Sequence, residues 1–119
     1  MKIIVCGAGE VGSNIAKQLV NEANDVTIID ESEELLRSIN QTLDVKSICG
    51  KPSYPAILEK ADAEESDMLI AVSENDEVNI ISCQIAENIF KVPVKVARIK
   101  ESNYLDKKWK ELFVKGGLA

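Results

Sequence analysis

The sequence is poor in several side chains that catalysis and metal binding commonly require. It has no histidine in its 119 residues, which excludes serine-histidine-aspartate and cysteine-histidine nucleophiles and the usual zinc sites. Its three cysteines, Cys6, Cys49 and Cys83, are odd in number, far apart and set in apolar stretches. We therefore expect small buried thiols in a reducing compartment and no disulfide framework.

Basic clusters and long apolar runs are also scarce. Fourteen Lys and Arg residues stand against 20 Asp and Glu residues, which gives a formal net charge of −6, and nowhere do five or more basic residues run together. We therefore expect no nucleic-acid partner. No apolar run approaches the roughly 18 residues of a membrane-spanning helix, and no signal-peptide pattern can be drawn. We expect a soluble chain that is not secreted.

Five short apolar runs, most of them rich in β-branched residues, follow one another along the chain. They are 3–6, 26–29, 45–49, 68–72 and 94–97. Runs of this kind predict strands that are buried on both faces of a parallel sheet. Because helical patterns separate them, we expect an α/β, Rossmann-like doubly wound sheet of about five strands in the order 3-2-1-4-5.

Apolar residues at helical spacing predict the connecting helices. The stripes contain Val11, Ile15, Ala16, Leu19 and Val20, then Leu35, Leu36, Ile39 and Leu43, then Val78, Ile81, Ile85 and Ile89 of a helix over 76–90, and last Leu105, Trp109, Leu112 and Phe113, with a stop at Gly116-Gly117. A short helix is expected over 56–60. Asp30 and Glu33 have the spacing of a capping pair for the second helix.

We expect one domain, 1–119. A complete six-stranded version would begin its next strand where this chain stops, so the sixth strand is missing and we expect a domain truncated at its C-terminus. The open edge of such a sheet favours pairing with a partner.

The first turn carries the main functional motif. The residues Gly7-Ala8-Gly9-Glu10-Val11-Gly12 follow the first strand and open a helix, as in the dinucleotide-binding pattern G-x-G-x-x-G. We expect Gly7 to make the tight turn, Gly9 to let the backbone approach a pyrophosphate, and Gly12 to let the helix pack closely. The helix N-terminus then supplies the free amides and the partial positive charge that phosphates need.

An acidic residue stands at the end of the second strand, where dinucleotide folds bind a ribose. Asp30 can accept hydrogen bonds from both ribose hydroxyls, and it would repel a 2′-phosphate, so we expect NAD or NADH to bind better than the phosphorylated forms. Glu31 adds a second negative charge. Glu10 in the loop would repel the γ-phosphate of a triphosphate and so counts against ATP. The alternative ligand class is an adenine nucleotide, ADP or ATP.

The chain resembles the TrkA N-terminal domain family, also called RCK or KTN domains. The resemblance rests on the segments 1–12, 26–30, 71–79 and 96–99 and extends over essentially the whole chain. It implies a cytoplasmic, NAD-binding gating subunit of a bacterial or archaeal potassium transport system. It also implies a homo-oligomer bound to an integral-membrane potassium-translocating subunit, and therefore a peripheral position on the inner face of the cell membrane.

The resemblance also implies roles for residues outside the glycine loop. Gly7 to Gly12 and Asp30 would hold the ligand, Ser73 and Glu74 would lie beside it, and Arg98 would point toward its phosphates or a neighbouring subunit. After the third strand, where the family usually has Gly-Asp near the adenine, this chain has Gly50-Lys51.

Two other functions are compatible with parts of the sequence. The chain could be the nucleotide-binding half of an NAD-dependent oxidoreductase without its substrate domain, although it has no Tyr-x-x-x-Lys pair and no histidine. A flavodoxin-like phosphoreceiver would need acidic residues where the glycines stand. We expect a regulatory module with no catalytic residues.

Overall fold

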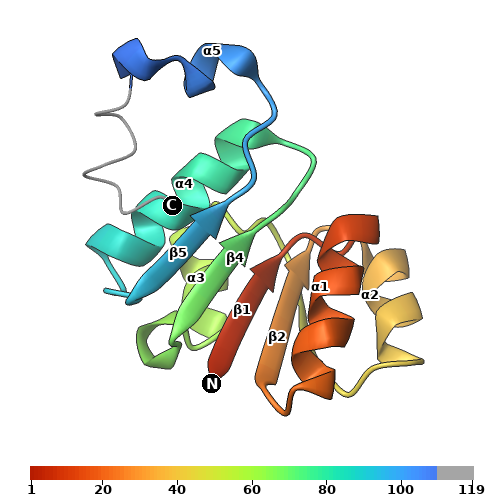
Figure 1. Ribbon diagram of the computed structural model, residues 1–119. Helices are drawn as coiled ribbons and strands as arrows, with labels where there is room; N and C mark the ends of the chain where they lie inside the picture. The colour runs from red at the N-terminus through yellow and green to blue at the C-terminus, as the bar shows by residue number, and fades with distance from the viewer. Residues whose placement is uncertain (110–119) are drawn as a thin grey trace.

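The fold is a parallel sheet with helices on both faces. The computed structural model describes residues 1–109, and its five strands lie in the order β3-β2-β1-β4-β5 with every neighbouring pair parallel. The predicted Rossmann-like architecture and strand order are therefore confirmed. Figure 1 shows that the strands point the same way, so that the turns after them all lie at one edge of the sheet.

The elements follow the predicted alternation closely. The strands are β1 (Lys2–Cys6), β2 (Asp25–Asp30), β3 (Lys46–Cys49), β4 (Met68–Ala71) and β5 (Val94–Ala97). The helices are α1 (Glu10–Asn21), α2 (Glu33–Asn40), α3 (Pro55–Lys60), α4 (Asp76–Asn88) and α5 (Ser102–Leu105), with the 3-10 turns η1 (Ala63–Glu65) and η2 (Lys107–Trp109).

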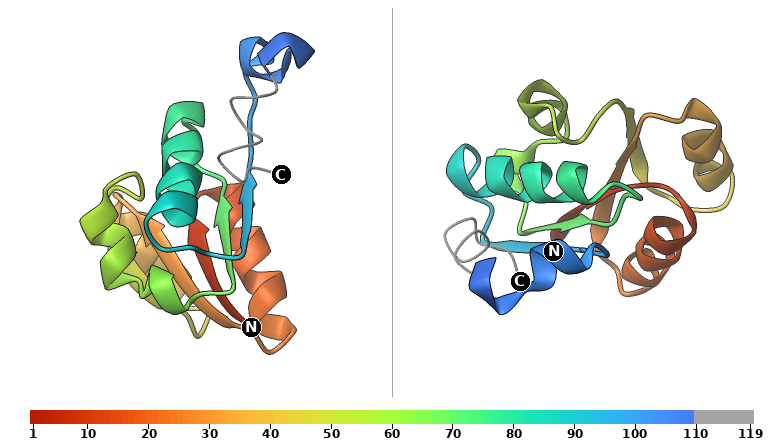
Figure 2. Two further views of the ribbon diagram at one scale, coloured as in Figure 1. Left: turned by 90° about the vertical axis from the view of Figure 1, so that its left-hand side faces the viewer. Right: turned by 90° about the horizontal axis from the view of Figure 1, so that it is seen from above.

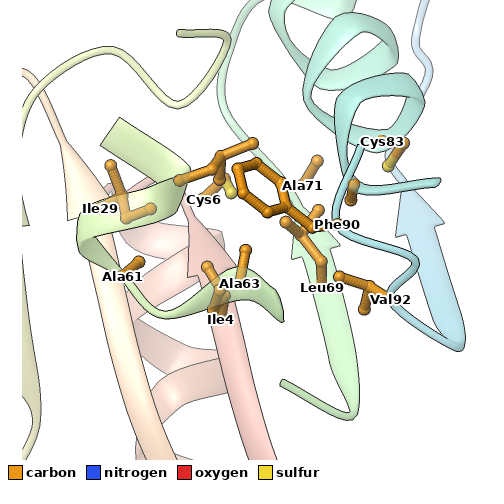
Figure 3. Close-up of a cluster of buried hydrophobic side chains, with 12 residues drawn as sticks. Ile4, Cys6, Ile29, Ala61, Ala63, Leu69, Ala71, Cys83, Phe90 and Val92 are labelled. Carbon is orange, nitrogen blue, oxygen red and sulfur yellow. The ribbon is translucent and has the colours of Figure 1, made fainter. Parts of the chain in front are cut away.

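Two apolar layers hold the helices on the sheet. Helices α1 and α2 cover one face, whereas α3 and α4 cover the other (Figure 2). In the layer under α3 and α4, the Phe90 ring lies among the side chains of Cys6, Leu69 and Ala71 (Figure 3). Because both faces are covered, the central strand β1 is buried from Ile3 to Cys6.

The two edge strands are less buried than their sequences predict. Ile48 of β3 is only partly buried and Cys49 is exposed, so the prediction that every thiol is buried is wrong for Cys49. Val94 of β5 is 41% exposed. The edge position explains both, because an edge strand has a neighbour on only one side.

The long helix α4 faces the sheet with a different set of residues from the predicted apolar stripe. Its buried residues include Asn79, Cys83 and Ala86, whereas Ile81 and Ile89 are 42% and 57% exposed. The small side chains let the helix lie close to β4 and β5. Of the predicted stripe, Ile81 and Ile89 are therefore exposed, whereas Ile85 is partly buried against the core.

The structure also corrects the predicted cap of the second helix and the predicted extent of the last helix. Helix α2 begins at Glu33 and is capped by Ser32, whose Oγ accepts a hydrogen bond from Leu35 N at 3.2 Å, so Asp30 is not its cap. The expected last helix is the short α5 followed by η2, beyond the carboxyl end of the sheet (Figure 1). The predicted positions from Leu112 to Gly117 lie outside the described residues.

One buried ion pair joins α4 to the amino end of β5. Lys95, only 6% exposed, donates from Nζ to Val92 O at 2.7 Å and pairs with Glu87 of α4. A buried lysine is tolerated when its charge is paired and its protons are bonded. This link lies at the end of β5 opposite the candidate site.

Candidate functional site

The glycine loop is locked onto the neighbouring turns. Gly7 has φ of +116°, which side chains other than glycine rarely adopt, and a Cβ there would lie 2.9 Å from Ser73 N. A Cβ at Gly12 would lie 1.8 Å from Gly7 O. The first and third glycines are thus required by close packing of the loop against α1 and against the turn after β4.

The middle glycine differs from the other two. Gly9 is the N-cap of α1, and a Cβ on it would meet no atom within 4 Å. The amides in the first turn of a helix have no partners within the helix, and glycine has no side chain to cap them. Glu10 and Val11 of this turn are exposed. The loop therefore presents free backbone donors to open space, which suits a phosphate.

Asp30 joins the glycine loop to the turn after β2. Its Oδ2 accepts from Ala8 N at 2.8 Å and its Oδ1 accepts from Ser32 N at 2.8 Å. A carboxylate offers about four acceptor positions, so both oxygens can still accept from ribose hydroxyls. The two amide bonds fix the carboxylate beside the first turn of α1.

The turn after β3 borders Asp30 on the outer side. Gly50 N donates to Asp30 O at 2.9 Å, and the Cys49 thiol donates to Glu31 O at 3.4 Å. Lys51 places its Nζ 5.7 Å from the centre of the Tyr54 ring, at cation–π distance. The Lys51 side chain is thus held against an exposed aromatic ring.

The turn after β4 is held by a residue that the sequence reasoning missed. Asn79 of α4 is fully buried, and its Oδ1 accepts from Ser73 N at 2.9 Å and from Ser73 Oγ at 2.7 Å. Its Nδ2 donates to Ser73 O at 3.0 Å and to Arg98 O at 2.9 Å. A polar residue between Val78 and Ile80 was the only signal in the sequence.

Basic side chains surround the turn after β4. Lys100 Nζ lies 2.9 Å from Glu74 Oε2, and Arg98 Nη1 lies 3.9 Å from Glu74 Oε1. The hydrogen bond from Lys100, with the charges of Lys100 and Arg98, lowers the pKa of Glu74. Arg98 Nη1 is buried and makes no hydrogen bond among residues 1–109, so its contact with Glu74 is an ion pair without a hydrogen bond.

The segment after β5 is anchored to the start of α4. Asp76 accepts from Lys100 N at 3.0 Å through Oδ1 and from Glu101 N at 2.7 Å through Oδ2. The hydrogen bond from the Lys100 amide is the main cause that lowers the pKa of this carboxyl. The start of α4 therefore fixes the path of the chain beyond Arg98.

The predicted residues come together at the carboxyl edge of the sheet. The glycine loop, Asp30 and Gly50 are joined by hydrogen bonds on the β2 and β3 side, and Ser73 and Arg98 are joined through Asn79 on the β4 and β5 side. Between the two groups the strand order reverses at β1 and β4, which is where doubly wound folds bind dinucleotides.

A hollow beside the loop lies to one side of this switch point in the strand order. A pocket of about 550 Å³ opens between α1 and α2, and its lining includes Gly9, Lys17, Leu35 and Thr42. Asp30, Ser73 and Arg98 do not line it. Among the described residues, no group of His, Cys, Asp and Glu side chains is arranged to hold a metal ion.

Comparison of the sequence with known families gives a match to the TrkA-N domain over residues 3–115. The chain belongs to this family. The TrkA proteins of the Trk potassium uptake systems of Halomonas elongata and Azorhizobium caulinodans are each 45% identical, over 91% and 94% of this chain. The chain spans about a quarter of the length of these curated relatives, 24% in each.

Solved structures share the fold of this TrkA-N domain at low sequence identity. The TrkA-N domain of the Escherichia coli inner membrane protein YbaL has a TM-score of 0.84 at 16% identity, over 99% of this chain and 85% of that one. The GsuK channel bound to NAD has a TM-score of 0.79 at 14% identity, over 98% and 20%. The AMP-bound C-terminal domain of Shewanella denitrificans Kef has 0.75 at 18%, over 100% and 70%.

No helix among residues 1–109 has the length and hydropathy that a membrane crossing requires.

Labelling of Cys49 offers a direct check of the adenosine side of the site. Burial raises the pKa of Cys6 above its ordinary range and that of Cys83 to about 12, so a thiol reagent at pH 8 is expected to modify only Cys49 in the native protein. Because Cys49 contacts the residue after Asp30, a bound adenine nucleotide is expected to slow this reaction several-fold. The Cys49→Ser variant is the control, and labelling unchanged by nucleotide would contradict the placement.

Proposed function

We propose that this TrkA-N domain binds NAD or NADH and regulates a potassium transport system without consuming the nucleotide. In the proposed assembly, copies of the chain form a homo-oligomer on the cytoplasmic side of the membrane, attached to an integral-membrane potassium-translocating subunit. The binding part of this proposal rests on this domain's own crevice, whereas the transport part rests on its relatives.

The observation that carries the proposal is the pairing of Asp30 with the uncapped start of α1. The carboxylate is fixed by Ala8 N at 2.8 Å, directly beside the amides that would take the pyrophosphate. A ribose at Asp30 would therefore lead into phosphates at Gly9 to Gly12, in the order found in an adenine dinucleotide. NADP is disfavoured because its 2′-phosphate would meet Asp30 and Glu31.

Known proteins support both the nucleotide-binding part and the potassium-transport part of the proposal. The GsuK structure contains NAD and the Kef domain contains AMP, and the TrkA relatives are potassium uptake proteins. NAD and AMP share the adenosine monophosphate moiety that the Asp30 side would bind. ADP or ATP would use the same side, with Glu10 opposing a third phosphate.

A regulatory role requires that the ligands differ in their effect. A nucleotide shifts a conformational equilibrium only as far as it binds one conformation better than the other. We therefore expect NAD and NADH to bind with unequal affinity and to change hydrogen exchange in the segment 98–105, which Asp76 and Asn79 tie to the crevice. Equal exchange with both ligands bound would contradict redox regulation.

A turnover assay separates this proposal from the oxidoreductase alternative. The purified chain, mixed with NADH and common aldehydes and ketones, is expected to oxidise no NADH above the protein-free control. Sustained NADH oxidation that is lost in the Asp30→Ala variant would favour the oxidoreductase.

Self-association can be tested at Ile81, an exposed residue of α4. Ile81 is 42% exposed in a shallow groove of about 210 Å³ that Ile85 and Ile89 also line. Because a buried charge is costly at an apolar contact, Ile81→Glu is expected to reduce the oligomer mass measured by light scattering to that of a monomer. Leu35→Glu on α2, where the side chain is 41% exposed, is the matched control. An oligomer that survives Ile81→Glu would exclude this surface as the contact.

A further inference from the structure

Asn79 is a polar residue of α4 that the fold encloses completely. It is fully buried, and both of its Nδ2 protons and both acceptor positions of its Oδ1 are used in hydrogen bonds. Buried amides are tolerated only when they are bonded in this way. All four bonds go to residues of the candidate site, three to Ser73 and one to Arg98.

Only an amide can make this set of bonds. Ser73 N and Oγ need an acceptor, whereas the carbonyl oxygens of Ser73 and Arg98 need a donor. A carboxylate at this position would keep the acceptor but would place negative charge against two carbonyls. An aliphatic residue would remove all four bonds, although Ser73 Oγ would keep its bond to Asn75 O at 3.1 Å. The side chain therefore specifies one relative position for the turn after β4 and the end of β5.

These two segments form the far wall of the crevice. The backbone of Ser73 packs against Gly7, where an added Cβ would lie 2.9 Å from Ser73 N. Arg98 contributes the guanidinium whose Nη1 is buried and unbonded among the described residues. Because a dinucleotide crosses the point where the strand order reverses, the nucleoside beyond the pyrophosphate would lie over this wall, opposite Asp30.

The adenosine side is built independently of Asn79. Asp30 is fixed by Ala8 N and Ser32 N, and Gly50 N binds Asp30 O. None of these contacts involves α4. A change at Asn79 therefore leaves the hydrogen bonds of Asp30 in place and acts first on Ser73 and Arg98.

We propose that Asn79 is the positioning residue of the nucleotide crevice, which sets Ser73 and Arg98 for the half of a dinucleotide beyond the pyrophosphate. This inference rests on the proposed function, since it assumes that the crevice binds a dinucleotide. It assigns Asn79 no direct contact with the ligand. It predicts that a substitution at Asn79 weakens the binding of a whole dinucleotide more than the binding of AMP, which represents its adenosine half.

The test compares NAD with AMP on the purified chain. Asn79→Asp is expected to weaken NAD binding by about tenfold or more, because Ser73 and Arg98 move, and to change AMP binding by less than about threefold. A purely structural role would weaken both ligands by the same factor. Lys95→Met is the matched control, because it removes another buried polar link between α4 and β5 at the far end of the strand; its two affinities are expected to change alike and by less than about threefold.

The outcomes distinguish failure of the proposed function from failure of the inference about Asn79. If the unmodified chain binds neither NAD nor AMP, the proposed function fails and this inference fails with it. If the unmodified chain binds both but Asn79→Asp weakens them equally or not at all, only the inference is overturned. Where Asn79→Asp does not fold, Asn79→Ser, which keeps one donor and one acceptor, is measured against the same ratio of the two affinities.

Discussion

Replacement of Gly9 by valine is expected to abolish nucleotide binding while leaving the fold almost unchanged. The backbone at Gly9 is extended, with φ of −71° and ψ of −163°, and a Cβ there would meet no atom within 4 Å. Valine adopts this conformation readily, so the free energy of unfolding should fall by no more than about 1 kcal/mol. The isopropyl group would occupy the space that a pyrophosphate needs over the first amides of α1.

The loss of two or three bonds from amides to a charged phosphate should weaken binding by about 100-fold or more. Calorimetry measures the affinity, and denaturant unfolding measures the stability of the same samples. Gly12→Ala is the contrasting variant, because its Cβ would lie 1.8 Å from Gly7 O and should destabilise the fold itself. If Gly9→Val bound NAD like the unmodified chain, the phosphates would not lie on this loop.

Replacement of Asp30 by alanine is expected to remove the preference for NAD over NADP. The variant loses the carboxylate that would accept from the ribose hydroxyls, so NAD affinity should fall by about 10- to 100-fold. NADP should lose much less, because the repulsion of its 2′-phosphate disappears at the same time. Calorimetric titration of both nucleotides gives the ratio directly.

The control for Asp30 is the neighbouring acid. Glu31 is exposed. The variant Glu31→Gln therefore removes a negative charge from the same region and leaves the hydrogen bonds of Asp30 to Ala8 and Ser32 intact. We expect it to narrow the NAD preference only slightly. If Asp30→Ala left the ratio of the two affinities unchanged, the ribose would lie elsewhere.

Much of the fold could be predicted because its signals are local. Apolar runs, glycine spacing and helical stripes are properties of neighbouring residues, and right-handed crossovers then restrict the strand order. The same logic brings the residues after the five strands to one edge. Asp30 lies at the end of β2, as the sequence predicts, and its bond to Ala8 N places it beside the glycine loop. Its role toward a ribose stays a prediction.

The wrong predictions concern features that depend on tertiary packing, such as which side of a helix faces the sheet. Periodicity shows that α4 has an apolar side but does not show that small residues such as Ala86 pack on the sheet while Ile89 faces outward. The exposure of Cys49 follows from the edge position of β3. Asn79 was missed because its partners, Ser73 and the carbonyl of Arg98, are brought to it only by the completed sheet.

The most direct test of the account is a calorimetric titration of the purified chain with NAD, NADH, NADP and ATP in one buffer. The account predicts that NAD and NADH each bind at one site per chain, with unequal affinities, and that both bind more tightly than NADP and ATP. Tighter binding of NADP, or the absence of heat with all four nucleotides, would contradict the central claim that Asp30 and the start of α1 form an NAD site.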